Sequence, residues 1–204
     1  MTGLSPNKDK ILEVSLDLFA AKGFRGTSIR DIANAVGISI SNIYHYFGNK
    51  EGVLLAILQR SAEDIAARLH QVSDSDIEPL ERFKRLVSTH VKLAVSRESV
   101  KEGKIFFLDE EHLSAEGNEI NLQLQRQILG IYLRELRTLQ SLGHIRPKSL
   151  TVMAFNVLAV INWCLRWYRP DGPMSLEDIS EEVVTFVLHG VLGSRPLDLE
   201  ASHS

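Results

Sequence analysis

The stretch Ser28–Lys50, SIRDIANAVGISISNIYHYFGNK, decides the fold of this chain. Its first residue and Asp31 have the spacing of a capping box, in which two side chains bond the exposed N–H groups at the start of a helix. Apolar residues then recur at helical spacing, at Ile29, Ile32, Ala33 and Val36. Gly37 follows at once, and a glycine there can take the left-handed conformation that ends a helix. The pattern predicts a short helix that stops at a sharp turn.

A second short helix is predicted after this turn. Ser39 can cap it, and Ile43 and Phe47, four residues apart, would face back toward the first helix. The outer face would then carry small polar and aromatic side chains, namely Ser39, Ser41, Asn42, Tyr44 and His45. A helix fits the major groove of B-DNA, where short polar side chains reach base edges. The pair predicts a DNA-binding helix-turn-helix, and the alternative is an ordinary helical hairpin with a polar surface.

The longer stretch Ile11–Leu58 resembles the DNA-binding domain of TetR-family transcriptional regulators. The resemblance is carried by the segments LF..KGF, T.IRDIA..VG and IYHYF..KE. It implies that Thr27, Tyr44 and Lys50 contact phosphates and that Arg30 reaches bases. Hydroxyl groups at a helix N-terminus form a natural phosphate site. The full set expected to contact DNA is Thr27, Ser28, Arg30, Ser39, Ile40, Ser41, Asn42, Tyr44, His45 and Lys50.

The charge distribution supports nucleic-acid binding only locally. The formal net charge of the 204 residues is −3, yet residues 1–60 hold seven Lys or Arg against five Asp or Glu. The positive charge is therefore concentrated where DNA is expected, and attraction to phosphate acts over about 10 Å. The chain is long enough for two units, so we expect a DNA-binding domain at 1–50, a larger helical domain at 51–195 and a tail at 196–204.

Several classes of site and location are disfavoured by the sequence. The single cysteine, Cys164, excludes an internal disulfide, and the N-terminus lacks an apolar signal core, so we expect a cytoplasmic protein. The apolar run 150–168 is interrupted by polar residues, which argues against a membrane span. The cluster 109–112, DEEH, has neighbouring residues that point apart on a helix, so we expect a solvated acidic patch and neither a metal nor a cofactor.

The rest of the chain is predicted to be helical, because apolar residues recur at intervals of three and four. The expected helices span about 50–73, 79–97, 101–112, 118–142 and 150–168, with a last helix capped by Ser175 and Asp178. The fold class is thus all-α, with about nine helices. The helix at 118–142 has a predicted buried seam of Leu122, Gln125, Leu129, Tyr132, Leu136 and Leu139.

The last two helices predict a homodimer. The helix at 150–168 is apolar on nearly every side and must be buried, either in a core or against another subunit. Two helices from each of two chains would form a large four-helix interface, and the last two helices of TetR-family proteins dimerise in this way. Two-fold symmetry then implies a near-palindromic double-stranded DNA operator, with half-sites about 34 to 36 Å apart or a multiple of that spacing.

The segment 162–179, NWCLRWYRPDGPMSLEDI, resembles the C-terminal part of TetR-family repressors that respond to coenzyme A thioesters. Trp163 and Arg166 combine a flat apolar surface with a fixed charge, which suits an adenine ring and phosphates. The alternative is that this segment only forms the turn between the dimer helices. The candidate effector-binding residues are Phe107, Tyr132, Asn156, Asn162, Trp163 and Arg166.

Together these features predict a transcriptional repressor that a small effector, such as an acyl-CoA thioester, releases from DNA. The rival interpretation is an all-helical acyl-thioester enzyme with a purely structural N-terminal hairpin. The sequence contains no nucleophile and base pair, glycine-rich phosphate loop or metal-ligand spacing that would favour this enzyme. Activation of transcription would use the same DNA-binding face and stays open.

Overall fold

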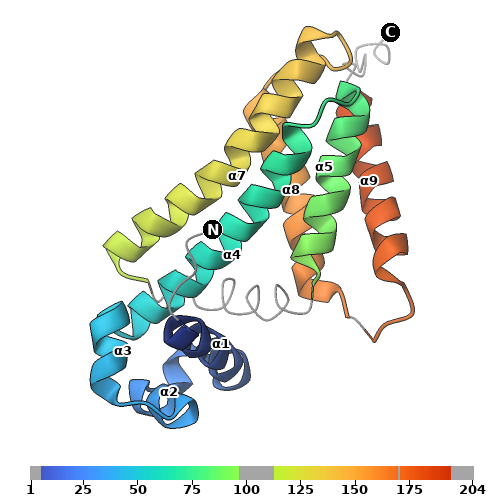
Figure 1. Ribbon diagram of the computed structural model, residues 1–204. Coiled ribbons are helices and arrows are strands. Elements are labelled where there is room, and N and C mark those ends of the chain that lie inside the picture. Colours follow the sequence, from blue (N-terminus) through green and yellow to red (C-terminus); the bar gives the residue numbers. More distant parts are fainter. Residues whose placement is uncertain (1–5, 97–112, 170, 194–204) are drawn as a thin grey trace, which may run out of the picture.

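Figure 1 shows a computed structural model of the protein, which describes residues 6–96, 113–169 and 171–193. These residues form eight helices and no strand, as the all-α prediction requires. The predicted helix at 101–112 and the predicted tail lie outside the described residues.

The N-terminal unit consists of α1 (Pro6–Gly26), which is interrupted at Gly23, α2 (Ile29–Val36) and α3 (Ile40–Phe47). The predicted capping box at the start of α2 is present, with Ser28 and Asp31 bonding each other's backbone N–H groups. Gly37 takes the predicted left-handed conformation, with φ 80° and ψ 36°. The unit encloses its own hydrophobic core, in which Phe19, Ile32 and Ile43 are buried.

A long helix, α4 (Lys50–Ser73), leads from this unit into a bundle. The bundle also contains α5 (Pro79–Ala94), α7 (Ala115–Ser141), α8 (Leu150–Trp167) and α9 (Leu176–Leu192). The predicted cap at Ser175 is confirmed, and Asn49 caps the start of α4. The described part of α5 ends three residues before the predicted bound, and α7 starts three residues early, because Ser114 caps it.

The predicted seam of α7 is correct only in its second half. Tyr132, Leu136 and Leu139 are buried in the core of the bundle, whereas Leu122 and Gln125 are exposed. The buried side chains in the first half are instead Asn121 and Leu124. The change of face has a physical cause, since the first turns of α7 pack against the core of the N-terminal unit.

A single chain buries only one face of α8, so of the two ways predicted for covering this apolar helix, its own core supplies only part. One face of α8 packs into the bundle through Ala154, Val157, Ile161 and Cys164. The opposite face exposes Val152, Phe155 and Trp163. By length and composition α8 could cross a membrane, but a core helix meets the same criterion. The exposed apolar face agrees with the predicted alternative, in which a second subunit covers this side of α8.

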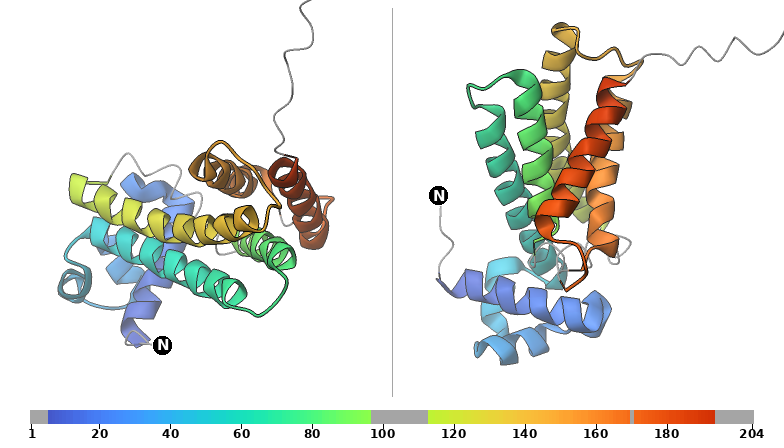
Figure 2. Two further views of the ribbon diagram at one scale, coloured as in Figure 1. Left: turned by 90° about the horizontal axis from the view of Figure 1, so that it is seen from above. Right: turned by 90° about the vertical axis from the view of Figure 1, so that its right-hand side faces the viewer.

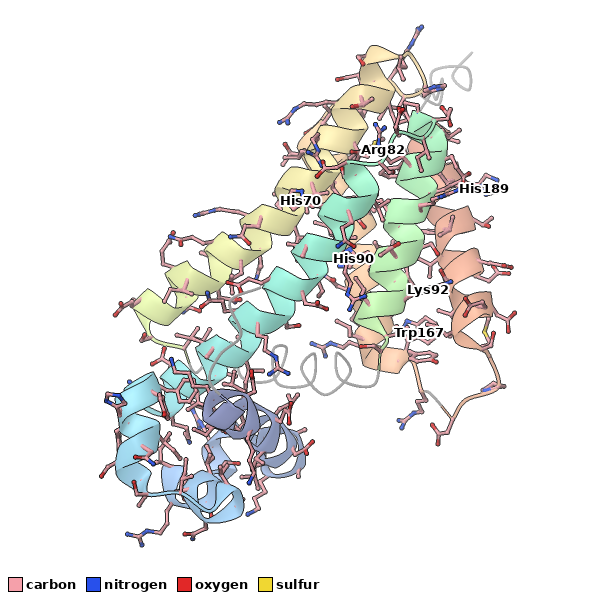
Figure 3. The ribbon with its side chains drawn as sticks, in the orientation of Figure 1. His70, Arg82, His90, Lys92, Trp167 and His189 are labelled. Carbon is pink, nitrogen blue, oxygen red and sulfur yellow. The ribbon has the colours of Figure 1, made fainter. Side chains whose placement is uncertain are left out.

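A buried carboxylate joins three helices at the end of the bundle far from α1–α3. Glu135 of α7 is 2% exposed and accepts a hydrogen bond of 2.8 Å from Nε of Arg82 in α5. Ser73, the last residue of α4, also donates its hydroxyl to Glu135. Figure 3 shows Arg82 at this distal end. The network holds the C-terminal end of α4 against α5 and α7, because a buried charge must be paired.

His90 of α5 and Tyr132 of α7 form a buried polar pair inside the bundle. Nδ1 of His90 lies 2.9 Å from the hydroxyl of Tyr132, and burial lowers the pKa of His90 to about 4. Figure 3 shows His90 within the bundle. The imidazole is therefore neutral in the folded protein above that pH.

This pair predicts a pH-dependent stability. The folded-state pKa of His90 is lower than the usual value of 6.5. Its contribution to the free energy of unfolding is therefore fully present above pH 6.5 and is lost as the pH falls toward 4. The loss should reach about 3 kcal/mol, since one pKa unit corresponds to about 1.4 kcal/mol. Urea denaturation of the wild type and of His90→Gln between pH 4 and 7 measures it. The variant should have a flatter profile, and equal slopes would contradict the assignment.

Candidate DNA-binding surface and effector region

The exposed face of α3 carries the predicted DNA-contacting side chains. Ser41, Asn42, Tyr44 and His45 are exposed, while Ile43 points into the core. Ser39 is exposed and caps the helix by accepting the N–H of Asn42 at 3.3 Å, and Ile40 is half-buried. Tyr44 is 52% exposed, which is a large exposed fraction for an aromatic side chain. The structure therefore brings these residues together at the N-terminal end and outer face of one helix, on the side of the molecule opposite the bundle (Figure 1).

The beginning of α2 adds two further predicted residues. Arg30 is exposed in the first turn. The hydroxyl of Ser28 donates to the carboxylate of Asp31 at 2.6 Å. This side-chain bond is the main cause that lowers the pKa of Asp31, and the backbone N–H of Ser28 adds to it. Ser28 thus fixes the start of α2, from which Arg30 projects.

Thr27 and Lys50 have structural roles that the sequence did not predict. Thr27 is only 1% exposed, and its hydroxyl donates to the carbonyl of Gly23 at 3.0 Å and lies 3.3 Å from that of Leu18. A side chain buried in this way does not reach a phosphate. The amino group of Lys50 donates to the carbonyls of Phe24 at 2.6 Å and Thr27 at 2.9 Å. We therefore revise the role of Thr27 to fixing the turn between α1 and α2. Lys50, which is half-buried, also holds this turn against α4, and its contact with a phosphate stays a prediction.

The sequence did not reveal two residues that position the helix-turn-helix, in which α3 is the recognition helix, the one expected to enter the major groove. Nζ of Lys10 donates to the carbonyl of Val36 at 3.2 Å and so bonds the end of α2. A Cβ atom on Gly52 would lie 1.9 Å from the carbonyl oxygen of Phe47, so only glycine fits between α4 and the end of α3. Both contacts join residues whose proximity depends on the packing of helices, which no local spacing reveals.

The candidate effector residues do not form one site in a single chain. Tyr132 lies in the core of the bundle, whereas Asn156, Trp163 and Arg166 lie on the exposed face of α8. Asn162 is half-buried, and Phe107 lies outside the described residues. Asn156 is exposed in a single chain, so its amide does not need a partner within the core.

One end of α8 presents an aromatic and cationic surface. Trp163 is 62% exposed, and Cζ of Arg166 lies 5.8 Å from the centroid of its ring. Trp167 is also exposed, and Figure 3 shows it at the end of α8 that is nearer to α1–α3. The combination of flat rings and a guanidinium group can stack on a heteroaromatic ring and bond an anion.

A groove of about 810 Å³ lies between α8 and α9. The residues that line it include Val152 and Asn156 of α8 and Phe186 of α9. Arg146 and Lys148 form a cationic end of the same groove. The groove is thus a mostly apolar surface that a single chain leaves uncovered.

Known proteins resemble this chain along nearly its whole length. Residues 11–57 match the family model described as bacterial regulatory proteins, tetR family. Residues 76–191, more than half of the chain, match the model described as tetracyclin repressor-like, C-terminal domain. The chain is 26% identical over 204 residues to the HTH-type transcriptional repressor KstR2 of Rhodococcus jostii, and the match covers 93% of each protein.

Solved structures show the same fold. The TetR-family regulator PfmR of Thermus thermophilus is 28% identical, with a TM-score of 0.78, and the match covers 88% of this chain and 97% of PfmR. AibR, solved in complex with isovaleryl coenzyme A and operator DNA, is 26% identical with a TM-score of 0.75. That match covers 91% of this chain and 98% of AibR. The chain belongs to the TetR family and is a DNA-binding transcriptional regulator.

Proposed function

We propose that this protein is a homodimeric repressor that an acyl-CoA thioester releases from a near-palindromic operator. The observation that carries this proposal is the similarity, over 91% of the chain, to AibR in its complex with isovaleryl coenzyme A and operator DNA. The KstR2 relatives, which are named as repressors, support the direction of the response. DNA and coenzyme A thioesters are both found in the bacterial cytoplasm, which is the location that we infer.

The dimer is proposed to form through α8 and α9. Large exposed apolar side chains are concentrated on these two helices, at Val152, Phe155, Trp163 and Phe186. Figure 2 shows that α8 and α9 lie on the side of the bundle away from α4, so a second chain can pack there without touching the link to the DNA-binding unit. An exposed apolar patch of this kind is typical of an interface between identical subunits.

The proposed roles on DNA predict different effects for two variants of α3. Tyr44→Ala should weaken binding to operator and unrelated DNA alike, because Tyr44 is assigned to the phosphate backbone. Asn42→Ala should weaken operator binding by about 10-fold to 100-fold, with little change for unrelated DNA, because Asn42 is assigned to a base edge. Titrations with operator and scrambled DNA at fixed salt measure both. Equal loss on both DNAs for Asn42→Ala would assign this residue to the backbone.

The effector is proposed to contact Trp163 and Arg166 with its nucleotide part. The exposed ring of Trp163 offers a stacking surface, and the guanidinium group beside it offers a fixed positive charge. The alternative is that Trp163 belongs only to the dimer contact. Trp163→Ala should then change the dimer dissociation constant and leave the affinity for isovaleryl-CoA unchanged.

A gel-shift titration on the gene's own upstream DNA tests the proposal. The protein should retard this DNA, and isovaleryl-CoA or a longer acyl-CoA should release it, whereas free coenzyme A and the free acid should not. No retarded band at low salt, with folded dimer present, would contradict the repressor. Chromatography of the acyl-CoA after incubation tests the rival enzyme, which would consume it, whereas a regulator leaves it unchanged.

A further inference from the structure

Helix α7 forms a second connection between the two parts of the molecule. Its second half lies in the core of the bundle, where Tyr132 and Leu136 are buried. Its beginning reaches the other core, because Leu124 is buried in the core of the N-terminal unit and Leu113 packs against it. Among the described helices after α3, only α4 and α7 contribute to both cores. The beginning of α7 therefore packs beside the first turns of α4, which belong to the core of the N-terminal unit.

One carboxylate joins the beginnings of these two helices. Glu51 lies in the first turn of α4, and its Oε1 accepts the backbone N–H of Ser114, the N-cap of α7, at 2.7 Å. The charge thus lies near the N-terminal ends of two helices, where helix dipoles favour an anion. Figure 1 shows the start of α7 beside the first turns of α4.

Gly117 provides the space for this carboxylate. A Cβ atom on Gly117 would lie 2.3 Å from Oε1 of Glu51. The atom that it would meet is the end of a flexible side chain, so an added methyl group displaces the carboxylate and leaves the helix intact. The glycine therefore allows α7 to seat against Glu51.

The same turn of α4 also touches the recognition helix. The next residue, Gly52, lies so close to Phe47 that its Cβ would be 1.9 Å from the carbonyl oxygen at the end of α3. A continuous chain of contacts thus runs from Ser114 through Glu51 and Gly52 to α3. No flexible side chain lies between Gly52 and α3, because the atom of Phe47 that Gly52 approaches belongs to the backbone.

The two ends of the α4–α7 pair are held with different strength. At the distal end, Glu135 is buried and bonded by Ser73 and Arg82. At the end near the DNA, the bond between Glu51 and Ser114 is exposed. An exposed hydrogen bond is weaker than a buried one, because water competes for its donor and acceptor. The bond between Glu51 and Ser114 is therefore easier to break than the network at Glu135.

We propose that the bond between Glu51 and Ser114 is the coupling point through which effector binding changes the position of α3. The proposal rests on the effector-released repressor described above. It makes Glu51 a positioning residue, which touches neither DNA nor effector and acts through Gly52 on the recognition helix. Loss of the bond should uncouple the two sites without removing either.

Four variants test this assignment. Glu51→Ala removes the acceptor, and Gly117→Ala displaces it from the other helix. Glu51→Gln keeps an acceptor oxygen for the N–H of Ser114 but removes the charge, so it controls for the helix dipole of α4. Gly130→Ala is the matched control, because it makes the same substitution in α7 with no atom within 4 Å of the added Cβ.

The first measurement is the coupling factor, the ratio of operator dissociation constants with and without saturating isovaleryl-CoA. Glu51→Ala and Gly117→Ala should reduce this factor at least about ten-fold while the affinity for isovaleryl-CoA stays within about two-fold of wild type. Glu51→Gln and Gly130→Ala should keep the wild-type factor. Wild-type coupling in both Glu51→Ala and Gly117→Ala would overturn the proposal.

A second measurement does not depend on the effector. A spin label on Ala35→Cys, an exposed position of α2, reports the distance between the two DNA-binding units of a dimer. Its distribution should broaden in Glu51→Ala and Gly117→Ala and stay narrow in the other two variants, whereas four equal distributions would overturn the proposal. If isovaleryl-CoA fails to release the wild type, the proposed effector is wrong, and the distance distributions still decide the role of Glu51.

Discussion

Phe186→Glu is expected to convert the protein from a dimer to a monomer and to abolish specific operator binding. Phe186 of α9 is 66% exposed in a single chain and lines the groove with Val152 and Asn156 of α8. In the proposed dimer the second subunit covers this groove, so a carboxylate from each subunit would be buried in a mostly apolar contact. Burying a charge in such a contact is costly, and two-fold symmetry places one on each subunit.

The loss of operator binding follows from the symmetry of the site. A single helix-turn-helix contacts one half-site, and only the dimer holds two of them at the operator spacing. The monomeric variant should therefore bind operator at least about 100-fold more weakly, by loss of the second half-site. Because Phe186 is exposed in the single chain, the fold itself should persist.

Analytical ultracentrifugation at micromolar concentration and a gel-shift titration measure the two effects. Circular dichroism checks that the helices remain. Gln71→Glu is the matched control, since it adds the same charge at an exposed position of α4, on the side of the bundle away from α8 and α9. A Phe186→Glu protein that sediments as a stable dimer would show that the subunits associate through another surface.

The features that the sequence predicted well are local. The capping box of Ser28 and Asp31, the left-handed Gly37 and the capping box of Ser175 and Asp178 each depend on residues a few positions apart. The same holds for the exposed face of α3, because the position of Ile43 in the core fixes where Asn42 and His45 point. Helical periodicity is set by the backbone itself, so it is visible without knowledge of any neighbouring helix.

The features that the sequence did not predict depend on which helix lies next to which. Lys50 has the position of a phosphate contact, yet its amino group bonds carbonyls of Phe24 and Thr27, more than twenty residues away. In the first half of α7, Leu124 is buried and Leu122 is exposed, because this part of the helix packs against the core of the N-terminal unit. An apolar helix such as α8 shows that burial is needed but not whether the same chain supplies it.

The effector site is the least determined part for a related reason. Trp163 and Arg166 lie side by side, as their spacing on one helix predicts, but Tyr132 faces the core of the bundle. Residues on different helices form one site only if the helices turn those faces toward each other. The sequence shows which residues share one face of a helix, but not how the faces of two helices are turned toward each other.

Gly52→Ala is expected to disrupt operator binding through the junction between α3 and α4. The added Cβ would lie 1.9 Å from the carbonyl oxygen and 3.0 Å from the carbonyl carbon of Phe47. Both are backbone atoms, so the clash cannot be relieved by a side-chain rotation and α3 must shift relative to α4. Overpacking of this kind costs about 1 to 3 kcal/mol, whereas alanine in a helix otherwise gains up to about 1 kcal/mol over glycine.

The sign of the stability change therefore separates a close backbone contact from an ordinary helical glycine. Gly130→Ala in α7 meets no atom within 4 Å and should stabilise the protein slightly, while Gly52→Ala should destabilise it. Denaturant unfolding gives both values, and a gel-shift titration should show at least about a ten-fold loss of operator affinity for Gly52→Ala alone. The loss follows because α3 carries the residues assigned to the bases, and a shift of the helix misplaces them together. Equal stabilisation by both substitutions, with operator affinity intact, would mean that the junction relaxes and that Gly52 does not position α3.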